Sequence, residues 1–376
     1  MYFKNAMVYT RGFTFRLGAF GVENGRFVDV LGPEHPDAVD LRGAYVIPGL
    51  IDIHTHGNSG ADFCDGDEQG LRRMARYNAQ NGVTAFTPAS MTLPYDVLEK
   101  AFAVGRAVAD APDADGARLL GVNMEGPFFS EKRKGAQNAA YLKLPDLDAF
   151  RRLQQGSGGL VKIVDLAPEL PGAAEFAKEA ARTCTVSVAH TDASYDQAAA
   201  VFDAGATHLT HLYNAMPGIH HRQPGPIGAA SERENVMAEL ICDGVHSHPS
   251  AVRMAFKLFP ERICLISDSM RACGMPEGES ELGGQKVFLK GRMATLADGT
   301  IAGSATNLYD CMTTAVSFGI PACQAVRAAT WNPAHEIGAL AERGSIENGK
   351  LADFVVCDAQ LCRQKVYLGG QEVPAK

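Results

Sequence analysis

The sequence predicts an α/β protein that combines a (β/α)8 TIM-like barrel with a small β-sandwich domain built from both chain ends. Three observations lead to this prediction. Between residues 49 and 345, short apolar segments alternate with segments of helical periodicity, which is typical of a parallel sheet. Residues 1–48 and 346–376 instead contain short alternating stretches separated by turns. A chain of 376 residues is long enough for one barrel and a small additional domain.

The first segment, residues 1–48, is expected to form strands and turns. The stretches "NAMVYT" and "FTFRLGAFGVENGRFVDVLG" alternate apolar and polar residues, and "ENGRF" is a hairpin signal. "AYVIPG" then leads into the first apolar segment of the barrel. Because "GSIENGKLADFVVCDAQLCRQKVYLGGQEV" near the C-terminus has the same character, we expect it to complete the small domain.

The barrel strands are expected at apolar stretches that end in polar residues: "GLIDIHTH", "GVTAFTPAS", "LLGVNMEG", "GLVKIVDLAPE", "TVSVAHT", "THLTHLYN", "MAELICDGVH" and "RICLISDSM". Helical periodicity predicts helices over 68–81, 97–110, 146–155, 173–182, 194–204, 249–257, 306–318 and 321–331. A further strand-like stretch, "QKVFLKGRMATLADGTIAG", precedes the last two helices. The number of units favours a closed barrel over an open sheet.

Composition excludes several classes of protein. The net charge of -8 and the pI near 5.8 argue against a general nucleic-acid binder. No apolar run is long enough to predict a membrane span, and "MYFKNAMVYTRGF" lacks the basic and then apolar order of a signal peptide. The nine cysteines show no C-x-x-C pair, which is typical of small buried residues in a reducing compartment. We therefore expect a cytoplasmic protein.

Polar residues at the strand ends suggest a metal site. His54 and His56 are two residues apart, so their side chains project from the same face of a strand. Later strand ends carry Glu125, His190, His211, His246 and Asp268. Because catalytic groups of such barrels gather at the C-terminal ends of the strands, we expect these side chains to converge. Imidazole and carboxylate groups are ligands of divalent metals such as zinc or iron. The alternative for any single histidine is a hydrogen-bonded structural role.

The order HTH, NMEGPF, AHT, HLTHLYNAMPG, DGVH and SDS resembles the amidohydrolase superfamily. Within it, "MEGPFFSEKRKGAQN" and "THLYNAMPGIHHRQPGPIG" are similar to the family of N-acetylglucosamine-6-phosphate deacetylases. The resemblance extends from "VIPGLIDIHTHG" to "GSIENGKLADFVVCD" and so covers nearly the whole chain. It implies a metal-dependent hydrolase that converts N-acetyl-D-glucosamine 6-phosphate to glucosamine 6-phosphate and acetate.

The resemblance also implies a role for each metal-site residue. Glu125 corresponds to a carboxylate ligand where other amidohydrolases use a carbamylated lysine, and His190 and His211 complete that site. His54 and His56 match a pair that holds a second metal in some members. One or two divalent cations per subunit, zinc or iron, are therefore expected, with Glu125 bridging them if two are bound.

Further roles concern catalysis and the substrate. Asp268 matches the catalytic aspartate, which would accept the proton of water and return it to the amine nitrogen. His246 is expected to hydrogen-bond the substrate or the developing oxyanion. Arg222 offers a forked donor for phosphate, and in family members it reaches the neighbouring subunit, which implies a homodimer. The full set of implied substrate contacts is Ala136, Gln137, Asn214, Ala215, Arg222, His246, Ile301, Ala302 and Gly303.

Other functions remain open at this stage. A deacetylase of the galactosamine analogue would share these motifs, whereas a cyclic amidase or a deaminase would favour a carbamylated lysine or a loop without "YNAMPG". A catalytically silent binding protein would have a degenerate site, which the presence of Glu125 and Asp268 disfavours. Of the extra histidines, His208 is expected to face away from His211, while His220, His221 and His248 are expected in loops.

Overall fold

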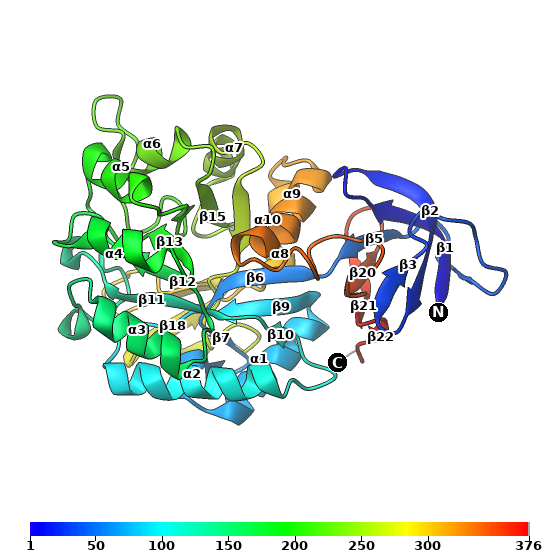
Figure 1. Cartoon of the computed structure of the whole chain (residues 1–376), viewed down its shortest axis with the longest axis horizontal. Coiled ribbons are helices and arrows are strands. Elements are labelled where there is room, and N and C mark those ends of the chain that lie inside the picture. The colour runs from blue at the N-terminus through cyan, green and yellow to red at the C-terminus, as the bar shows by residue number, and fades with distance from the viewer. Residues whose placement is uncertain (375–376) are drawn as a thin grey trace.

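The computed structural model describes residues 1–374 and contains two parallel sheets flanked by helices (Figure 1). The first sheet comprises β6 (Leu50–Thr55), β9 (Val83–Pro88) and β10 (Arg118–Leu119). The second follows chain order through β11 (Val122–Phe128), β12 (Val161–Leu166), β13 (Thr185–Val188), β14 (His208–Leu209), β15 (Met237–Ile241) and β16 (Ile263–Ile266). Each predicted barrel strand is present. Most of their residues are buried, as expected for strands covered on both faces.

Backbone hydrogen bonds connect the two parallel sheets. Beyond β9, the N–H of Ser90 donates to the carbonyl of Asn123 in β11 over 2.9 Å. Beyond β16, the N–H of Asp268 donates to the carbonyl of His54 in β6, also over 2.9 Å. These bonds join the segment after β9 to β11 and the segment after β16 to β6, and the predicted site residues His54, Glu125 and Asp268 lie in or next to the joined segments.

Helices are present at the predicted segments, and their ends differ from the predicted ends by a few residues. They are α1 (Glu68–Gln80), α2 (Tyr95–Asp110), α3 (Leu147–Gly156), α4 (Ala173–Ala180), α5 (Tyr195–Asp203), α6 (Gly225–Ser231), α7 (Pro249–Leu258), α8 (Leu308–Ser317), α9 (Ala322–Ala329) and α10 (Trp331–Glu336). The short α6 was not predicted. Within the part of the chain that the structure describes, no helix is long and apolar enough to span a membrane.

Local sequence explains several helix boundaries. Asp67 begins α1 by accepting hydrogen bonds from the N–H groups of Gln69 and Gly70. Ser194 and Gln197 form a capping box at the start of α5. The single helix predicted over 321–331 is divided between α9 and α10. Pro333 provides the reason, because it lacks the N–H that would donate to the carbonyl of the residue four positions earlier.

The chain ends form one sheet rather than the predicted sandwich of two. Its order is β22 (Gln371–Glu372), β21 (Arg363–Leu368), β20 (Phe354–Cys357), β5 (Tyr45–Pro48), β1 (Tyr2–Tyr9), β2 (Phe15–Glu23) and β3 (Arg26–Val28), with β4 (Val39–Asp40) paired to β1. The reason is that β5 pairs with both β1 and β20 and so joins the two chain ends. Aromatic side chains of this sheet, including Phe3, Phe20 and Phe354, form a buried apolar cluster.

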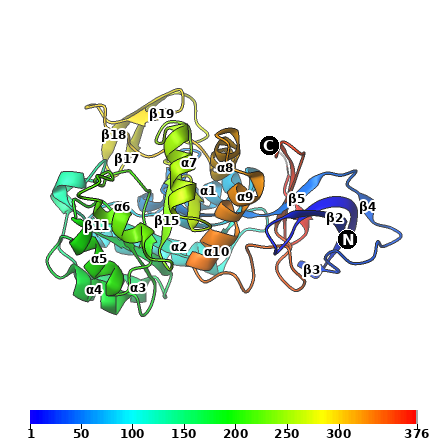
Figure 2. The ribbon, with the colours of Figure 1, turned by 90° about the horizontal axis from the view of Figure 1, so that it is seen from above.

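Short elements complete the fold. An antiparallel insert, β17 (Gly278–Leu282), β18 (Gln285–Lys290) and β19 (Met293–Thr295), follows the last parallel strand and lies away from the small sheet (Figure 2). The Gln285 side chain in this insert donates to the carbonyl of Ala136. Minor elements are the ribbon β7 (Gly57–Asn58) with β8 (Ala61–Asp62), and 3-10 turns at Phe63–Asp65, Glu131–Arg133 and Ala139–Tyr141.

Candidate active site

The ends of four parallel strands bring Glu125 and four histidines together. Glu125 lies in β11, and one of its carboxylate oxygens, Oε1, is 3.1 Å from His190 Nε2 and 3.2 Å from His211 Nε2. The two imidazole nitrogens are 3.1 Å from each other. Three potential ligand atoms from β11 and from the segments after β13 and β14 therefore meet at one point, as the sequence predicted.

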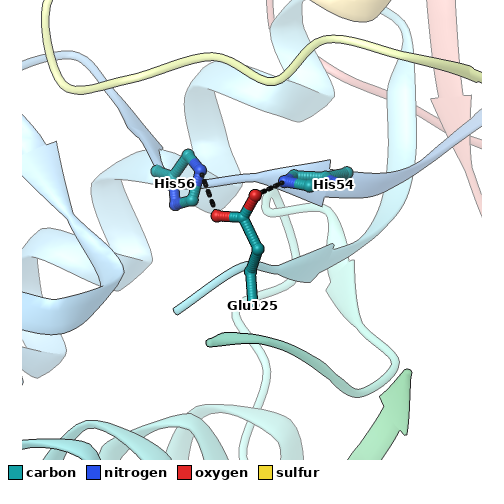
Figure 3. A group of neighbouring side chains, drawn as sticks. All are labelled: His54, His56 and Glu125. Atoms are coloured by element: carbon teal, nitrogen blue, oxygen red, sulfur yellow. Dashed lines mark ion pairs between the residues drawn. The ribbon is translucent and has the colours of Figure 1, made fainter. Parts of the chain in front are cut away.

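His54, in β6, and His56, just after the strand, approach the same carboxylate (Figure 3). His56 Nε2 is 3.3 Å from Glu125 Oε2, and His54 Nε2 is 3.5 Å from Glu125 Oε1. Both imidazoles point toward Glu125, as expected for residues two apart in a strand. Glu125 thus lies between the two pairs of histidines.

Hydrogen bonds on the outer side fix three of the imidazoles. His190 Nδ1 is 2.9 Å from the carbonyl of Arg133, and His56 Nδ1 is 3.2 Å from the carbonyl of Ala89. A carbonyl oxygen only accepts, so each Nδ1 carries the hydrogen and Nε2 turns its lone pair inward in the neutral ring. His54 Nδ1 has the carboxylate of Glu239 as its partner, at 2.9 Å. In the neutral ring, each inward Nε2 therefore offers the lone pair that a metal ligand requires.

Burial and neighbouring charges define the electrostatics. Burial opposes ionisation of Glu125, but the adjacent imidazoles of His54, His190 and His211 outweigh it and hold the pKa of Glu125 well below its usual range. Burial likewise opposes protonation of His56, yet Asp268 and Glu125 raise its pKa to about 10. Glu125 is therefore an ionised carboxylate surrounded by imidazoles.

Both halves of the cluster fit a divalent metal. Ligand atoms of Glu125, His190 and His211 lie within 4.8 Å of one another, as do those of His54, His56 and Glu125. His54 Nε2 is buried and has no hydrogen-bond partner within residues 1–374, which is unfavourable unless another group binds it. Imidazole nitrogens with a carboxylate form a donor set that suits such a cation.

The backbone at three of these positions is left-handed. The φ angles are 43° at His190, 27° at His211 and 47° at Asp268, a region that residues other than glycine rarely adopt. Each of these residues lies two positions after the end of a parallel strand, β13, β14 or β16. Strain of this kind is retained where surrounding contacts enforce it, and it occurs often at functional sites.

Asp268 lies at the edge of the cluster. Its Oδ1 is 3.3 Å from His56 Nε2 and 3.7 Å from His54 Nε2. Burial would raise its pKa, but the hydrogen bond and the charges of the two histidines lower it below the ordinary value. Asp268 thus lies next to the potential metal ligands, as the sequence predicted, and its lowered pKa favours the ionised form.

A cavity of about 190 Å³ opens above these residues. Its lining includes Glu125 and Asp268, together with most of the predicted substrate contacts: Ala136, Gln137, Asn214, Ala215, His246, Ile301 and Gly303. Met91, Leu282 and Thr300, which were not predicted, also line it. Ala302 is fully buried and packs in an apolar cluster instead of lining the cavity.

Arg222 does not line this cavity. It is exposed in the loop before α6, where its Nη1 is 2.7 Å from His221 Nε2, and it borders a separate surface groove with Arg133 and Asp192. The expected contact of Arg222 with substrate is therefore not formed within a single chain.

Two carboxylates that the sequence analysis did not single out hold site histidines. Asp243 Oδ2 is 2.8 Å from His246 Nδ1, and Asp243 Oδ1 accepts from the backbone N–H of His246. Glu239, in β15, has its carboxylate 2.9 Å from His54 Nδ1. Two features of the sequence could have indicated these roles. Asp243 lies three residues before His246, and Glu239 is a charged residue within the apolar stretch "MAELIC".

His208 faces away from the metal-site cluster, as predicted. It is fully buried, and its Nε2 is 3.2 Å from Glu239 Oε1 while its Nδ1 is 3.4 Å from Glu336 Oε1, neither with hydrogen-bond alignment. Burial opposes its protonation, but the two glutamates raise its pKa to about 10.

The sequence is similar to those of known amidohydrolases over most of its length. Residues 45–373 match the model of the amidohydrolase family. The chain is 36% identical to an N-acetylglucosamine-6-phosphate deacetylase from Bacillus subtilis (strain 168), over 98% of this chain and 97% of the relative. It is also 34% identical to an N-acetylgalactosamine-6-phosphate deacetylase from Escherichia coli O157:H7, over 89% of this chain and 90% of the relative.

Solved structures of similar proteins have the same fold over the length of this chain. A mutant N-acetyl-D-glucosamine-6-phosphate deacetylase from Mycobacterium smegmatis, in complex with N-acetyl-D-glucosamine-6-phosphate, superposes with a TM-score of 0.93 at 32% identity and covers 99% of each chain. The enzyme from Thermotoga maritima gives a TM-score of 0.90 at 26% identity, with each chain fully covered. These similarities confirm the predicted α/β architecture of the TIM-barrel type.

Proposed function

The chain belongs to the amidohydrolase family, and we propose that it is a metal-dependent hydrolase that removes the acetyl group from N-acetyl-D-glucosamine 6-phosphate. One observation carries the mechanism: Glu125 lies between two pairs of histidines at the base of a cavity, next to the ionised Asp268. The products are glucosamine 6-phosphate and acetate.

Two metal positions are proposed in this cluster. Glu125, His190 and His211 would hold one divalent cation, and His54 and His56 would hold a second with Glu125 as the bridge. The nitrogen and oxygen donors favour zinc or iron. A cation bound there supplies Lewis acidity, which polarises the amide carbonyl and lowers the pKa of water.

Asp268 is proposed as the general base and general acid. Its carboxylate accepts a proton from water as the water oxygen attacks the acetyl carbonyl carbon. The same proton then passes from Asp268 to the amide nitrogen, the carbon–nitrogen bond breaks, and the amine leaves. The lowered pKa of Asp268 keeps it ionised for the first of these transfers.

His246 is proposed to orient the sugar. Asp243 accepts the Nδ1 hydrogen, so Nε2 of the neutral ring is left as an acceptor for a substrate hydroxyl. Donation from Nε2 to the developing oxyanion would require a protonated ring. Asn214, Ala215, Ala136, Ile301 and Gly303 border the same cavity and would complete the contacts.

Arg222 is proposed to bind the 6-phosphate across a dimer interface. This accounts for its exposed position outside the cavity of its own chain. The guanidinium offers two parallel donors to phosphate. A homodimer would then be required for full activity.

The same proposal covers the domain organisation. Residues 49–345 would form one (β/α)8 barrel, supported by the hydrogen bonds that join the two parallel sheets. Residues 1–48 and 346–376 would form the small β-domain, supported by the sheet and the aromatic cluster that the two chain ends share up to residue 374. A cytoplasmic location remains a prediction.

A second candidate substrate is the galactosamine analogue. The identity of 34% to an N-acetylgalactosamine-6-phosphate deacetylase supports it, and the two sugars differ only in the configuration of one hydroxyl group. The reaction and the residues would be the same.

The proposal is tested by metal removal. The purified protein is dialysed against a chelator, and acetate release from N-acetylglucosamine 6-phosphate is measured before dialysis, after it, and after zinc or iron is restored. Activity should be lost and then recovered. Full activity in protein shown by elemental analysis to be metal-free would contradict the mechanism.

A further inference from the structure

One carboxylate oxygen contacts ligand residues of both proposed metal positions. Glu239 lies in the middle of β15 and is completely buried. Its Oε2 is 2.9 Å from His54 Nδ1 and accepts a hydrogen bond from the backbone N–H of His211 over 3.1 Å. His54 and His211 belong to different proposed metal positions, so Glu239 contacts one ligand residue of each position.

The two contacts act on different features of the ligands. For His54, a carboxylate at Nδ1 keeps the hydrogen on that atom and leaves the lone pair on Nε2, the atom that faces Glu125. For His211, the contact holds the backbone N–H of a residue whose φ of 27° is otherwise unfavourable. Glu239 therefore fixes a ring state at one position and a backbone conformation at the other.

A row of charges stabilises this buried carboxylate. Glu239 Oε1 faces His208 Nε2 at 3.2 Å, and His208 Nδ1 faces Glu336 at the end of α10 at 3.4 Å. An isolated buried carboxylate would be strongly destabilising, so His208 provides the compensating positive charge. The row from His54 to Glu336 thus runs from the metal cluster through the interior to a helix on the outside of the strands.

We propose that Glu239 is a positioning residue that couples the two metal positions of this site. It holds His54 Nε2 ready to bind a cation, and it holds the His211 backbone in the conformation that directs the ring at Glu125. This inference rests on the proposed function for the identity of the two positions. Loss of the acceptor oxygen should weaken cation binding at both, most at the position of His54 and His56.

The test compares variants by metal binding. Zinc affinity is measured by competition with a chelator in the full-length protein for the parent, Glu239→Gln, Glu239→Ala and Glu336→Gln. Glutamine keeps an oxygen that can accept both hydrogen bonds, so it should bind zinc within a few-fold of the parent. Alanine should weaken binding about 10- to 100-fold, the usual effect of removing such an outer partner. Glu336→Gln is the matched control, since it removes a charge at the far end of the row without touching a ligand.

Parental zinc affinity at both positions in a folded Glu239→Ala variant would overturn the proposal. An equal loss in Glu336→Gln and Glu239→Gln would also overturn it, because the role would then be that of a charge in a structural row. If the alanine variant does not fold, nitrogen-15 NMR of the zinc-loaded parent decides. The proton of the His54 ring is expected on Nδ1, and finding it on Nε2 would contradict the inference. None of these measurements uses a substrate, so failure of the proposed reaction would leave them unchanged.

Discussion

Gln137 donates a hydrogen bond from Nε2 to Glu125 Oε2 over 2.8 Å, and its Oε1 accepts one from the backbone N–H of Thr92 over 2.7 Å. Both ends of the amide are therefore bound within the protein. The resemblance to the deacetylases implied that Gln137 contacts substrate. The side chain borders the cavity, but its principal contacts fix the carboxylate between the two pairs of histidines.

Replacing Gln137 by alanine should weaken metal binding. The carboxylate of Glu125 would lose the partner that orients Oε2, and loss of such a partner typically costs about 10- to 100-fold in metal affinity. Chelator competition measures the change. Gln285→Ala is the control, because Gln285 contacts the backbone of the same loop without touching Glu125. An unchanged affinity in Gln137→Ala would show that Glu125 is oriented by the histidines alone.

Replacing Asp268 by asparagine should remove turnover while the protein keeps its fold and most of its metal. Asparagine is nearly isosteric but does not accept a proton at neutral pH, and general acid–base catalysis contributes roughly 10²- to 10⁴-fold. The measurements are kcat for acetate release and metal content by elemental analysis. A kcat within a few-fold of the parent would exclude Asp268 as the proton carrier.

Replacing Arg222 by alanine should act selectively on the phosphorylated substrate. Charge-assisted hydrogen bonds contribute on the order of 1.5–3 kcal/mol, or roughly ten- to a hundred-fold in kcat/KM. The slow rate with unphosphorylated N-acetylglucosamine should hardly change, and Arg222→Lys should recover only part of the loss.

The control for Arg222 is Arg73→Ala, which removes an exposed arginine on α1, away from the cavity. If both substrates lost activity by the same factor, Arg222 would serve the fold or the dimer. Mixing Arg222→Ala with Asp268→Asn subunits gives a further check, because an arginine that acts across the interface should restore activity to part of the mixed dimers.

Replacing Asp243 by asparagine should raise KM more than it lowers kcat. The asparagine amide can donate to His246 Nδ1, which would move the ring hydrogen to Nε2 and remove the acceptor for the sugar hydroxyl. One such hydrogen bond corresponds to about a tenfold change in KM. His248→Asn, which changes an exposed histidine at the start of α7, is the control. A large fall in kcat with unchanged KM would instead place His246 at the reacting carbonyl.

Much of the site could be predicted because alternation in strands is visible in sequence. The pair His54 and His56 had to share a face of β6, and a strand–helix rhythm places strand ends on one side of the molecule. The convergence of Glu125, His190 and His211 follows from the same rule. The roles of individual residues came from resemblance, not from the pattern.

The remaining features depend on contacts between segments that are distant in sequence. Glu239 occupies the middle of an apolar strand, and only the fold shows that His54 and His208 lie on either side of its carboxylate. The left-handed backbone at His190 and His211 has no sequence signal, since neither is glycine. The union of the two chain ends in one sheet depends on β5, whose two partners come from opposite ends of the chain.

The central claim is that this chain deacetylates a 6-phosphorylated amino sugar, and the most direct test is a comparison of kcat/KM for acetate release. The substrates are N-acetylglucosamine 6-phosphate, its galactosamine analogue and unphosphorylated N-acetylglucosamine, all with the same metal-loaded preparation. We predict the highest value for N-acetylglucosamine 6-phosphate and a value at least roughly tenfold lower without the phosphate, as expected for a charge-assisted contact. Equal values with and without the phosphate, or no acetate from any of the three, would contradict the account.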